Sequence, residues 1–260
     1  MSQRAIKRIA LITMIIDHIG AYIPGMPIWL RCIGRISAPL FFFCCAWGFE
    51  HTKDKKKYML RLYFAGVLMS LGNVAVYSFV GHGPHQDIPE NGIFTTLFVG
   101  TLICYMWEKK RYGMLCLYAV YQVSLFGAEI LLNKLIPHGM SDGASLVFNA
   151  VTGFLLYVEG GITCVFLFVA LYLFKDIPIL LADVMLCYSY VVYKGANRAW
   201  NNAYLRFDVF RMWSFQYLAV FALIFMLLYN GQKGKGSKYF YYVFYPVHVW
   251  VLYIIEKILS

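Results

Sequence analysis

The stretch KRIALITMIIDHIG, residues 7–20, places four ionisable side chains in one otherwise apolar segment of membrane-spanning length. Ionisable groups inside a membrane span are costly, so they indicate function. Lys7 and His18 are eleven residues apart, and on a helix they share a face, separated by roughly 16 Å along the axis. A cation near the membrane surface would thus be aligned with a buried imidazole. This suits a long anionic donor whose phosphates stay in water, and acyl-coenzyme A is the obvious candidate.

The composition excludes an ordinary soluble protein. Of 260 residues, 61% are hydrophobic and 14% charged, against roughly 45–50% apolar residues in soluble domains. Aromatic residues make up 18% of the chain, which suits helices with aromatic belts at both membrane interfaces. The composition predicts an all-α, polytopic integral membrane helix bundle that forms a single domain over residues 1–260.

Apolar runs long enough to cross a bilayer recur along the whole sequence. They predict nine transmembrane helices, at 5–23, 28–50, 58–80, 91–107, 113–134, 145–174, 177–193, 212–229 and 239–257. The sixth run holds Glu159 beside Gly160 and Gly161, so it is either one tilted helix or a broken pair. We expect the first run to be a retained span and not a cleaved signal, since no convincing small-residue cleavage site follows it.

The formal charge of +10 comes from cations clustered in short segments between the apolar runs. With the N-terminus in the cytoplasm, fifteen Lys and Arg residues lie on the inner side and six on the outer side, as the positive-inside rule requires. We therefore predict a multi-pass protein of the cell membrane that contacts lipid and binds no nucleic acid. The polar segment 194–211 breaks this pattern, so it is an outer, substrate-facing loop or the span count is off by one.

His18 is the strongest catalytic candidate, because an imidazole near neutral pH can act as a general base or a transient acyl acceptor. The structural alternative is a buried histidine bonded between helices. Asp17 favours function, since two adjacent ionisable groups in one span are hard to explain as structure. Consecutive helix residues point about 100° apart, so we expect Asp17 to orient a neighbouring helix or a water and not to contact His18.

Two arginines in the second predicted span, Arg31 and Arg35, lie one helical turn apart and share a face. A guanidinium in a span needs an anionic or carbonyl partner. The carboxylates that could pair with them are Asp17, Glu129, Glu159 and Asp183. The seven cysteines all lie in apolar runs without paired metal-type spacing, so neither a disulfide nor a metal site is expected.

Five spaced motifs resemble the TraX family. They are KRIALITMIIDHIG at 7–20, GRISAPLFFFCCAWGFEHT at 34–52, KYMLRLYFAG at 57–66, NGIFTTLFVG at 91–100 and FYPVHVWVL at 244–252. The resemblance implies a membrane acetyltransferase, the namesake acetylating the N-terminus of conjugative F-pilin. The opening is more distantly similar to the acyltransferase-3 family, whose first span carries a basic residue, ten intervening positions and a histidine; here Lys7 stands in place of the usual arginine. By this resemblance His18 is catalytic, and Arg35 and Arg61 are donor or structural contacts.

We thus expect an acyltransferase that moves acetyl from acetyl-CoA to an amine or hydroxyl of a protein N-terminus, glycan or lipid. His18, Asp17 and Arg35 would form the catalytic group, with Arg35 stabilising charge on the thioester oxygen, and Lys7, Arg61 and Arg31 would contact the donor. The alternatives are two. A proton-coupled transporter or lipid flippase would use Asp17, His18, Glu129 and Glu159 as a relay, and an assembly factor would be non-catalytic.

Overall fold

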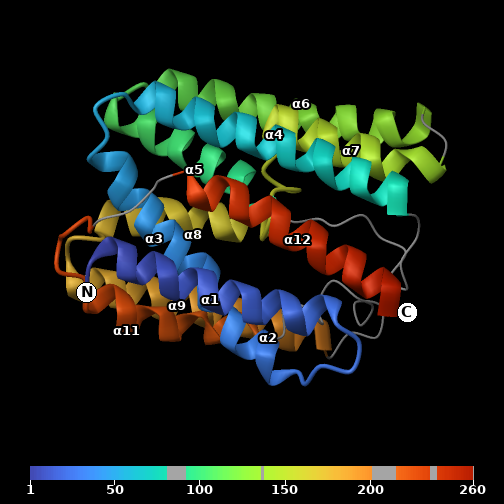
Figure 1. The fold of residues 1–260 in the computed structure, drawn as a ribbon. Coiled ribbons are helices and arrows are strands. Elements are labelled where there is room, and N and C mark those ends of the chain that lie inside the picture. The colour runs from blue at the N-terminus through green and yellow to red at the C-terminus, as the bar shows by residue number, and fades with distance from the viewer. Residues whose placement is uncertain (81–91, 136–137, 201–214, 235–238, 260) are drawn as a thin grey trace. The chain divides into compact units, whose positions relative to one another are not determined.

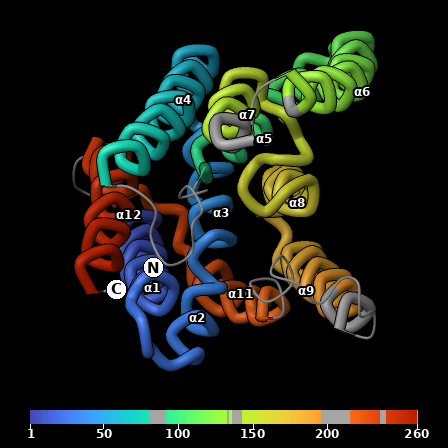
Figure 2. The backbone as a smooth tube through the Cα atoms, turned by 90° about the vertical axis from the view of Figure 1, so that its right-hand side faces the viewer, coloured from blue at the N-terminus to red at the C-terminus, as the bar shows by residue number. Residues whose placement is uncertain are grey.

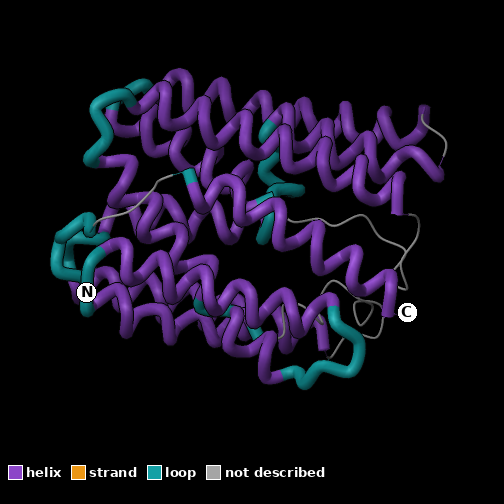
Figure 3. The backbone as a smooth tube through the Cα atoms, viewed as in Figure 1, coloured by secondary structure: helices purple, strands orange, loops and turns teal. Residues whose placement is uncertain are grey.

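The computed structural model describes residues 1–80, 92–135, 138–200, 215–234 and 239–259. Within these ranges the regular structure is entirely helical, with no strand (Figure 3), so the all-α prediction is confirmed. The elements are α1 (Gln3–Tyr22), α2 (Trp29–Gly34), α3 (Ser37–Glu50), α4 (Lys55–Val80), α5 (Ile93–Glu108), α6 (Tyr112–Leu135), α7 (His138–Thr152), α8 (Gly161–Phe174), α9 (Pro178–Trp200), the 3-10 helix η2 (Gln216–Phe221), α11 (Ala222–Leu227) and α12 (Phe240–Leu259) (Figure 1).

Among the described residues, four helical segments are long and apolar enough to cross a membrane, as expected of a polytopic membrane protein. They are Trp29–Glu50, Lys55–Val80, Tyr112–Leu132 and Phe240–Leu259. Shorter apolar helices cover Ile93–Glu108, Gly143–Thr152, Gly161–Phe174 and Gln216–Leu227. The predicted count of nine spans is therefore not confirmed. Helix α1 has the expected length but is not among the four, and its sequence carries Arg4, Lys7, Arg8 and Asp17.

The sixth and seventh predicted spans differ from the helices that the structure shows. The sixth run is the broken pair, because α7 ends at Thr152 and α8 begins at Gly161. Three glycines allow the break, with positive φ at Gly153 (66°), Gly160 (74°) and Gly161 (59°), a conformation that side chains with a Cβ disfavour. The seventh span, predicted to end at 193, continues as α9 to Trp200. The polar segment 194–211 thus begins inside a helix, and its residues from 201 on lie outside the described ranges.

The chain forms two compact units, and each unit joins segments far apart in the sequence. The first unit comprises Met1–Trp47 and Ala170–Tyr239, with Leu259. The second comprises Gly48–Val169 and Phe240–Ile258.

In the first unit, α1 packs along α2 and α3 (Figure 2). Ile6, Ala10 and Met14 are almost completely buried, and their spacing of four places them on one face of the helix. Polar contacts connect this face to α3: Ser37 Oγ donates to the Ala10 carbonyl (2.8 Å), Gln3 Nε2 donates to the Cys44 carbonyl (2.7 Å), and Cys44 Sγ donates to the Gln3 carbonyl (3.6 Å). These hydrogen bonds fix the position of α1 along α3.

In the second unit, glycines let α4 approach its neighbours closely. A Cβ at Gly72 would lie 2.1 Å from the Trp250 ring of α12, and one at Gly66 would lie 2.6 Å from Thr95 Oγ1 of α5. The Trp250 indole also donates to Asn73 Oδ1 at 2.8 Å. Helix α4 thus lies close against both α5 and α12 through small residues, and a partly buried hydrogen bond connects it to α12.

Candidate functional site

Helix α1 carries both leading candidates from the sequence, Asp17 and His18, as buried residues (9% and 7% exposed). Their burial extends the apolar face that begins at Ile6, which explains why polar groups here need partners from the protein. Lys7 lies in the same helix, about one turn from its start, and is partly exposed, so the predicted alignment of Lys7 with His18 follows from the helix itself. The His18 ring makes an edge contact with Tyr22, with 6.1 Å between ring centroids.

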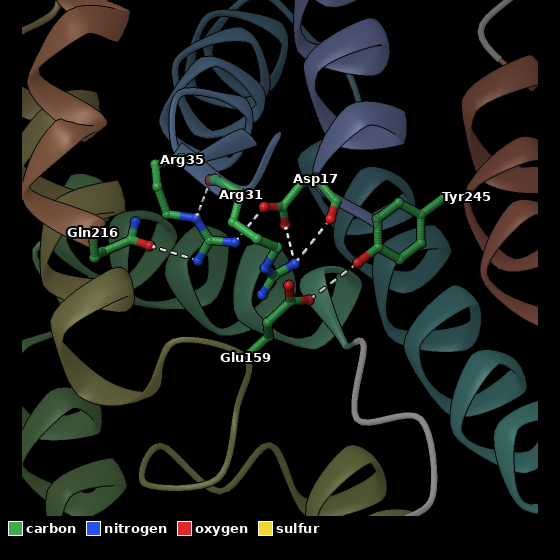
Figure 4. A network of polar contacts seen from close by, with 6 residues as sticks. All are labelled: Asp17, Arg31, Arg35, Glu159, Gln216 and Tyr245. Atoms are coloured by element: carbon green, nitrogen blue, oxygen red, sulfur yellow. Dashed lines mark hydrogen bonds and ion pairs between the residues drawn. The ribbon is translucent and has the colours of Figure 1, made fainter. Parts of the chain in front are cut away.

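Asp17 is the carboxylate that both membrane arginines use (Figure 4). Its Oδ2 lies 2.9 Å from Arg31 Nη1, and its Oδ1 lies 2.5 Å from Arg35 Nη2. Arg31 Nη1 also donates to the Asp17 backbone carbonyl at 3.1 Å. The expectation that Asp17 orients a neighbouring helix therefore agrees with this geometry, since α2 is the element that it holds.

Arg35 also bonds to two further groups of the first unit. Its Nε donates to the Arg31 carbonyl at 3.1 Å, and its Nη1 donates to Gln216 Oε1 at 3.2 Å. Gln216 begins η2, so the guanidinium connects the α1–α2 pair to an element almost two hundred residues later. This many directed bonds hold the planar group in one orientation.

The backbone of α2 packs tightly against the Asp17 side chain at Gly34. A Cβ built on Gly34 would lie 2.1 Å from Asp17 Cβ and 2.3 Å from its Oδ1. Real carbon contacts are roughly 3.5–4.0 Å, so only glycine fits at this position. Gly34 thereby sets how closely α2 approaches α1 beside the ion pairs.

The cluster of Asp17, Arg31 and Arg35 carries one net positive charge, because two guanidinium groups meet one carboxylate. The side chains are only 13–14% exposed. Charges with so little exposure to solvent act strongly on any nearby anion or developing negative charge. The residue that follows Asp17 is His18, so a buried cationic cluster adjoins a proton acceptor in the sequence of α1.

The other predicted contacts belong to the second unit. Arg61 lies on α4, with its guanidinium 5.5 Å from the Tyr58 ring centre. Glu159, one of the carboxylates considered for Arg31 and Arg35, accepts hydrogen bonds from the Gly92 amide (2.9 Å) and the Tyr245 hydroxyl (3.1 Å); Figure 4 also draws this Tyr245 bond. Its place in the break between α7 and α8 thus gives the carboxylate donors within its own unit.

The two remaining carboxylates considered as arginine partners lie in different settings. Glu129 is buried in α6, and Asp183 is exposed on α9. In the described ranges no group of three His, Cys, Asp or Glu residues could hold a metal ion.

Two participants were not identified from the sequence, Gln216 and Gly34. No spacing rule links Gln216 to a motif 181 residues earlier. Gly34 had a signal, since it stands directly before Arg35 in GRISAP, and small residues at helix interfaces in membranes let the backbones approach closely.

The fold and site define a polytopic, helical membrane protein with a buried, net-cationic cluster beside a histidine. The family model described as "TraX protein" matches residues 2–256, and the chain belongs to the TraX family. No solved structure matches it.

Two curated relatives match parts of the chain. A "Probable fimbrial assembly protein FimC, serogroup H1" of Dichelobacter nodosus is 37% identical over 67 residues, covering 24% of this chain and 28% of that protein. An "Uncharacterized protein RP591" of Rickettsia prowazekii (strain Madrid E) is 40% identical over 110 residues, covering 42% of this chain and 38% of that protein. The chain thus spans well under half the length of either relative.

Proposed function

We propose that this protein is a membrane acyltransferase that transfers acetyl from acetyl-CoA to an amine or hydroxyl acceptor. The observation that carries the proposal is the buried, net-positive cluster of Asp17, Arg31 and Arg35. The carboxylate of this cluster, Asp17, directly precedes His18 in α1. Acyl transfer needs a proton acceptor and a fixed positive field at the carbonyl oxygen. The TraX family resemblance, which implies acetyltransferases, supports the same chemistry.

In the proposed reaction the acceptor nitrogen or oxygen attacks the thioester carbonyl carbon and forms the new C–N or C–O bond. The neutral imidazole of His18 takes the acceptor's proton. The C–S bond then breaks, and the imidazolium returns a proton to the coenzyme A thiolate, so the enzyme ends unchanged. A relay in which His18 carries the acetyl group is the two-step version of the same transfer.

The arginines have separate roles in this scheme. Arg35 stabilises the negative charge that develops on the thioester oxygen, and Arg31 contacts the donor. Asp17 is a positioning residue, because its carboxylate holds both guanidinium groups. Lys7 lies about three turns from His18 on the same helix, where it binds donor phosphates.

The acceptor is proposed to belong to a pilus or another cell-surface structure. The partial relative from Dichelobacter nodosus is named a fimbrial assembly protein, and the family's namesake acts on pilin. The N-terminal amine of a small surface protein is therefore the first acceptor to test.

The test uses the full chain in lipid nanodiscs with acetyl-CoA and a set of peptides with free N-terminal amines, and mass spectrometry detects acetylated peptide. His18→Gln is expected to lower the rate by about 100-fold or more. His51→Gln is the matched control, since the His51 side chain is 66% exposed, and it should retain the rate. Lys7→Gln should raise KM for acetyl-CoA. Equal rates for His18→Gln and the wild type, or no binding of acetyl-CoA by folded protein, would overturn the proposal.

A proton-coupled transporter is the second candidate, favoured by Glu129. This residue of α6 is only 3% exposed, and its Oε2 has no hydrogen-bond partner among the described residues. A buried carboxylate in a membrane helix is typical of proton pathways. Proteoliposomes with an internal pH dye test it: a proton flux that Glu129→Gln abolishes and His18→Gln leaves intact would favour this function. An assembly factor would show neither activity.

A further inference from the structure

The segment Asn230–Gly234 pairs with the first residues of the chain inside the first unit. Asn230 N donates to the Met1 carbonyl at 2.9 Å, and Gln3 N donates to the Gln232 carbonyl at 2.8 Å. The Met1 nitrogen also donates to the Leu228 carbonyl. These backbone bonds fix the loop after α11 against the start of α1.

Two glycines allow this close fit. Gly231 and Gly234 both have φ of 76°, in the left-handed region that favours glycine. A Cβ on Gly234 would lie 3.0 Å from Arg4 Cβ and 3.0 Å from Ser2 Oγ. The loop backbone therefore lies directly beside the side chain of the first arginine of α1.

The pairing brings two basic segments together. Arg4, Lys7 and Arg8 share one face of the first two turns of α1, with spacings of three and four. Lys233 is exposed on the loop, and Arg8 and Lys233 have no ion-pair partner among the described residues. The sequence holds no acidic residue between Met1 and Ile16, or between Val209 and Ile255. The positive charge of this surface is thus not balanced by neighbours along the chain.

We propose that the start of α1 and the Asn230–Gly234 loop together form a phosphate-binding surface. Its four cations would be Arg4, Lys7, Arg8 and Lys233. Phosphate oxygens form strong, charge-assisted hydrogen bonds with Lys and Arg side chains. Several cations close together therefore suit a ligand that carries several phosphates. The inference rests on the proposed function for its first ligand, the diphosphate and 3′-phosphate of coenzyme A.

The same chemistry would recognise the phosphodiester of an anionic lipid headgroup. The geometry favours the nucleotide. Lys7 belongs to this surface and also shares a helix face with His18, so phosphates bound here lie about three turns from the proposed reacting atom.

The experiment measures the Kd of coenzyme A and of 3′-dephospho-coenzyme A by calorimetry, with the full chain in nanodiscs of neutral phosphatidylcholine. Lys233→Glu and Arg8→Glu are each expected to weaken coenzyme A binding about fivefold. Lys134→Glu changes the net charge equally, at an exposed site of α6, and should leave the Kd unchanged. In the wild type, 3′-dephospho-coenzyme A should bind more weakly, and the weakening should grow at low salt.

A second arm compares the thermal stability of each variant in neutral nanodiscs and in nanodiscs with phosphatidylglycerol. Selective loss of coenzyme A affinity in Lys233→Glu and Arg8→Glu supports the surface with the nucleotide as its ligand. Unchanged coenzyme A affinity, with loss of the stabilisation by phosphatidylglycerol, supports it with lipid as the ligand. If both variants match Lys134→Glu in both arms, the phosphate-binding surface is wrong. If the wild type does not bind coenzyme A at all, the proposed function fails, and the lipid arm alone decides the surface.

Discussion

Replacing Gly34 by alanine is expected to push the Asp17 carboxylate away from both of its arginines. The added methyl carbon would lie 2.1 Å from Asp17 Cβ and 2.3 Å from its Cγ. Because carbon contacts are roughly 3.5–4.0 Å, the two helices or the side chain must move by about 1.4 Å. The Arg31 pair at 2.9 Å would then open past the limit of a direct ion pair.

The size of the effect follows from overpacking and from the damaged ion pairs. Forcing one methyl group into a tight contact costs about 1–3 kcal/mol, and partial exposure of two buried charges adds to this. We expect a loss of about 3 kcal/mol, which lowers Tm by roughly 6–12 °C for a chain of this size.

Thermal unfolding of detergent-purified protein, followed by tryptophan fluorescence or circular dichroism, measures the shift. Gly127→Ala in α6 is the matched control, because a Cβ there meets nothing within 4 Å, and its Tm should not fall. A wild-type Tm for Gly34→Ala would refute the close packing of α2 on Asp17. A variant Gly34→Ser should fall at least as far as Gly34→Ala, since its side chain is larger.

Three further substitutions test the polar contacts of the two units by the same unfolding measurement. Asp17→Asn removes the carboxylate that pairs with both guanidinium groups and should destabilise by about 3–5 kcal/mol; a change below about 1 kcal/mol would show that other groups, water or lipid replace the carboxylate. Asn73→Ala removes the acceptor of the Trp250 indole (2.8 Å) and should cost about 1–3 kcal/mol, with a blue-shifted tryptophan emission as a second readout. Tyr245→Phe removes one donor to Glu159 (3.1 Å) and should cost about 1 kcal/mol, whereas an unchanged Tm would mean that the Gly92 amide suffices.

The helices themselves were largely predictable, because each long apolar run leaves the backbone only one way to satisfy its hydrogen bonds in a membrane. The ends of the helices were less predictable. The predicted span 177–193 ends at the first polar residues, yet α9 continues through residues 194–199 to Trp200. Lysine, alanine and arginine are strong helix formers, and the helix continues across Gly195 and Asn197. Polarity therefore marks where a helix leaves the apolar zone and not where it ends.

The site was predictable in its parts but not in its pairing. Arg31 and Arg35 required an anion, and four carboxylates were available. Asp17 is the one that meets both, since the turn after α1 lets α2 fold directly back along it. Sequence periodicity places a side chain on a helix face, whereas the identity of the facing residue depends on tertiary packing. For this reason neither Gln216 nor the fit at Gly34 could be derived.

The interleaved order of the two units has a consequence for synthesis at the ribosome. Asp17, Arg31 and Arg35 lie within one helical hairpin, so their charges can neutralise each other as soon as that hairpin enters the membrane. Gln216 emerges 181 residues after Arg35, which takes roughly 10–40 s at ordinary rates of translation. The second unit is completed later still, after α12 has been synthesised. The nascent chain therefore inserts a paired charge cluster first and adds its last polar contacts only near the end of translation.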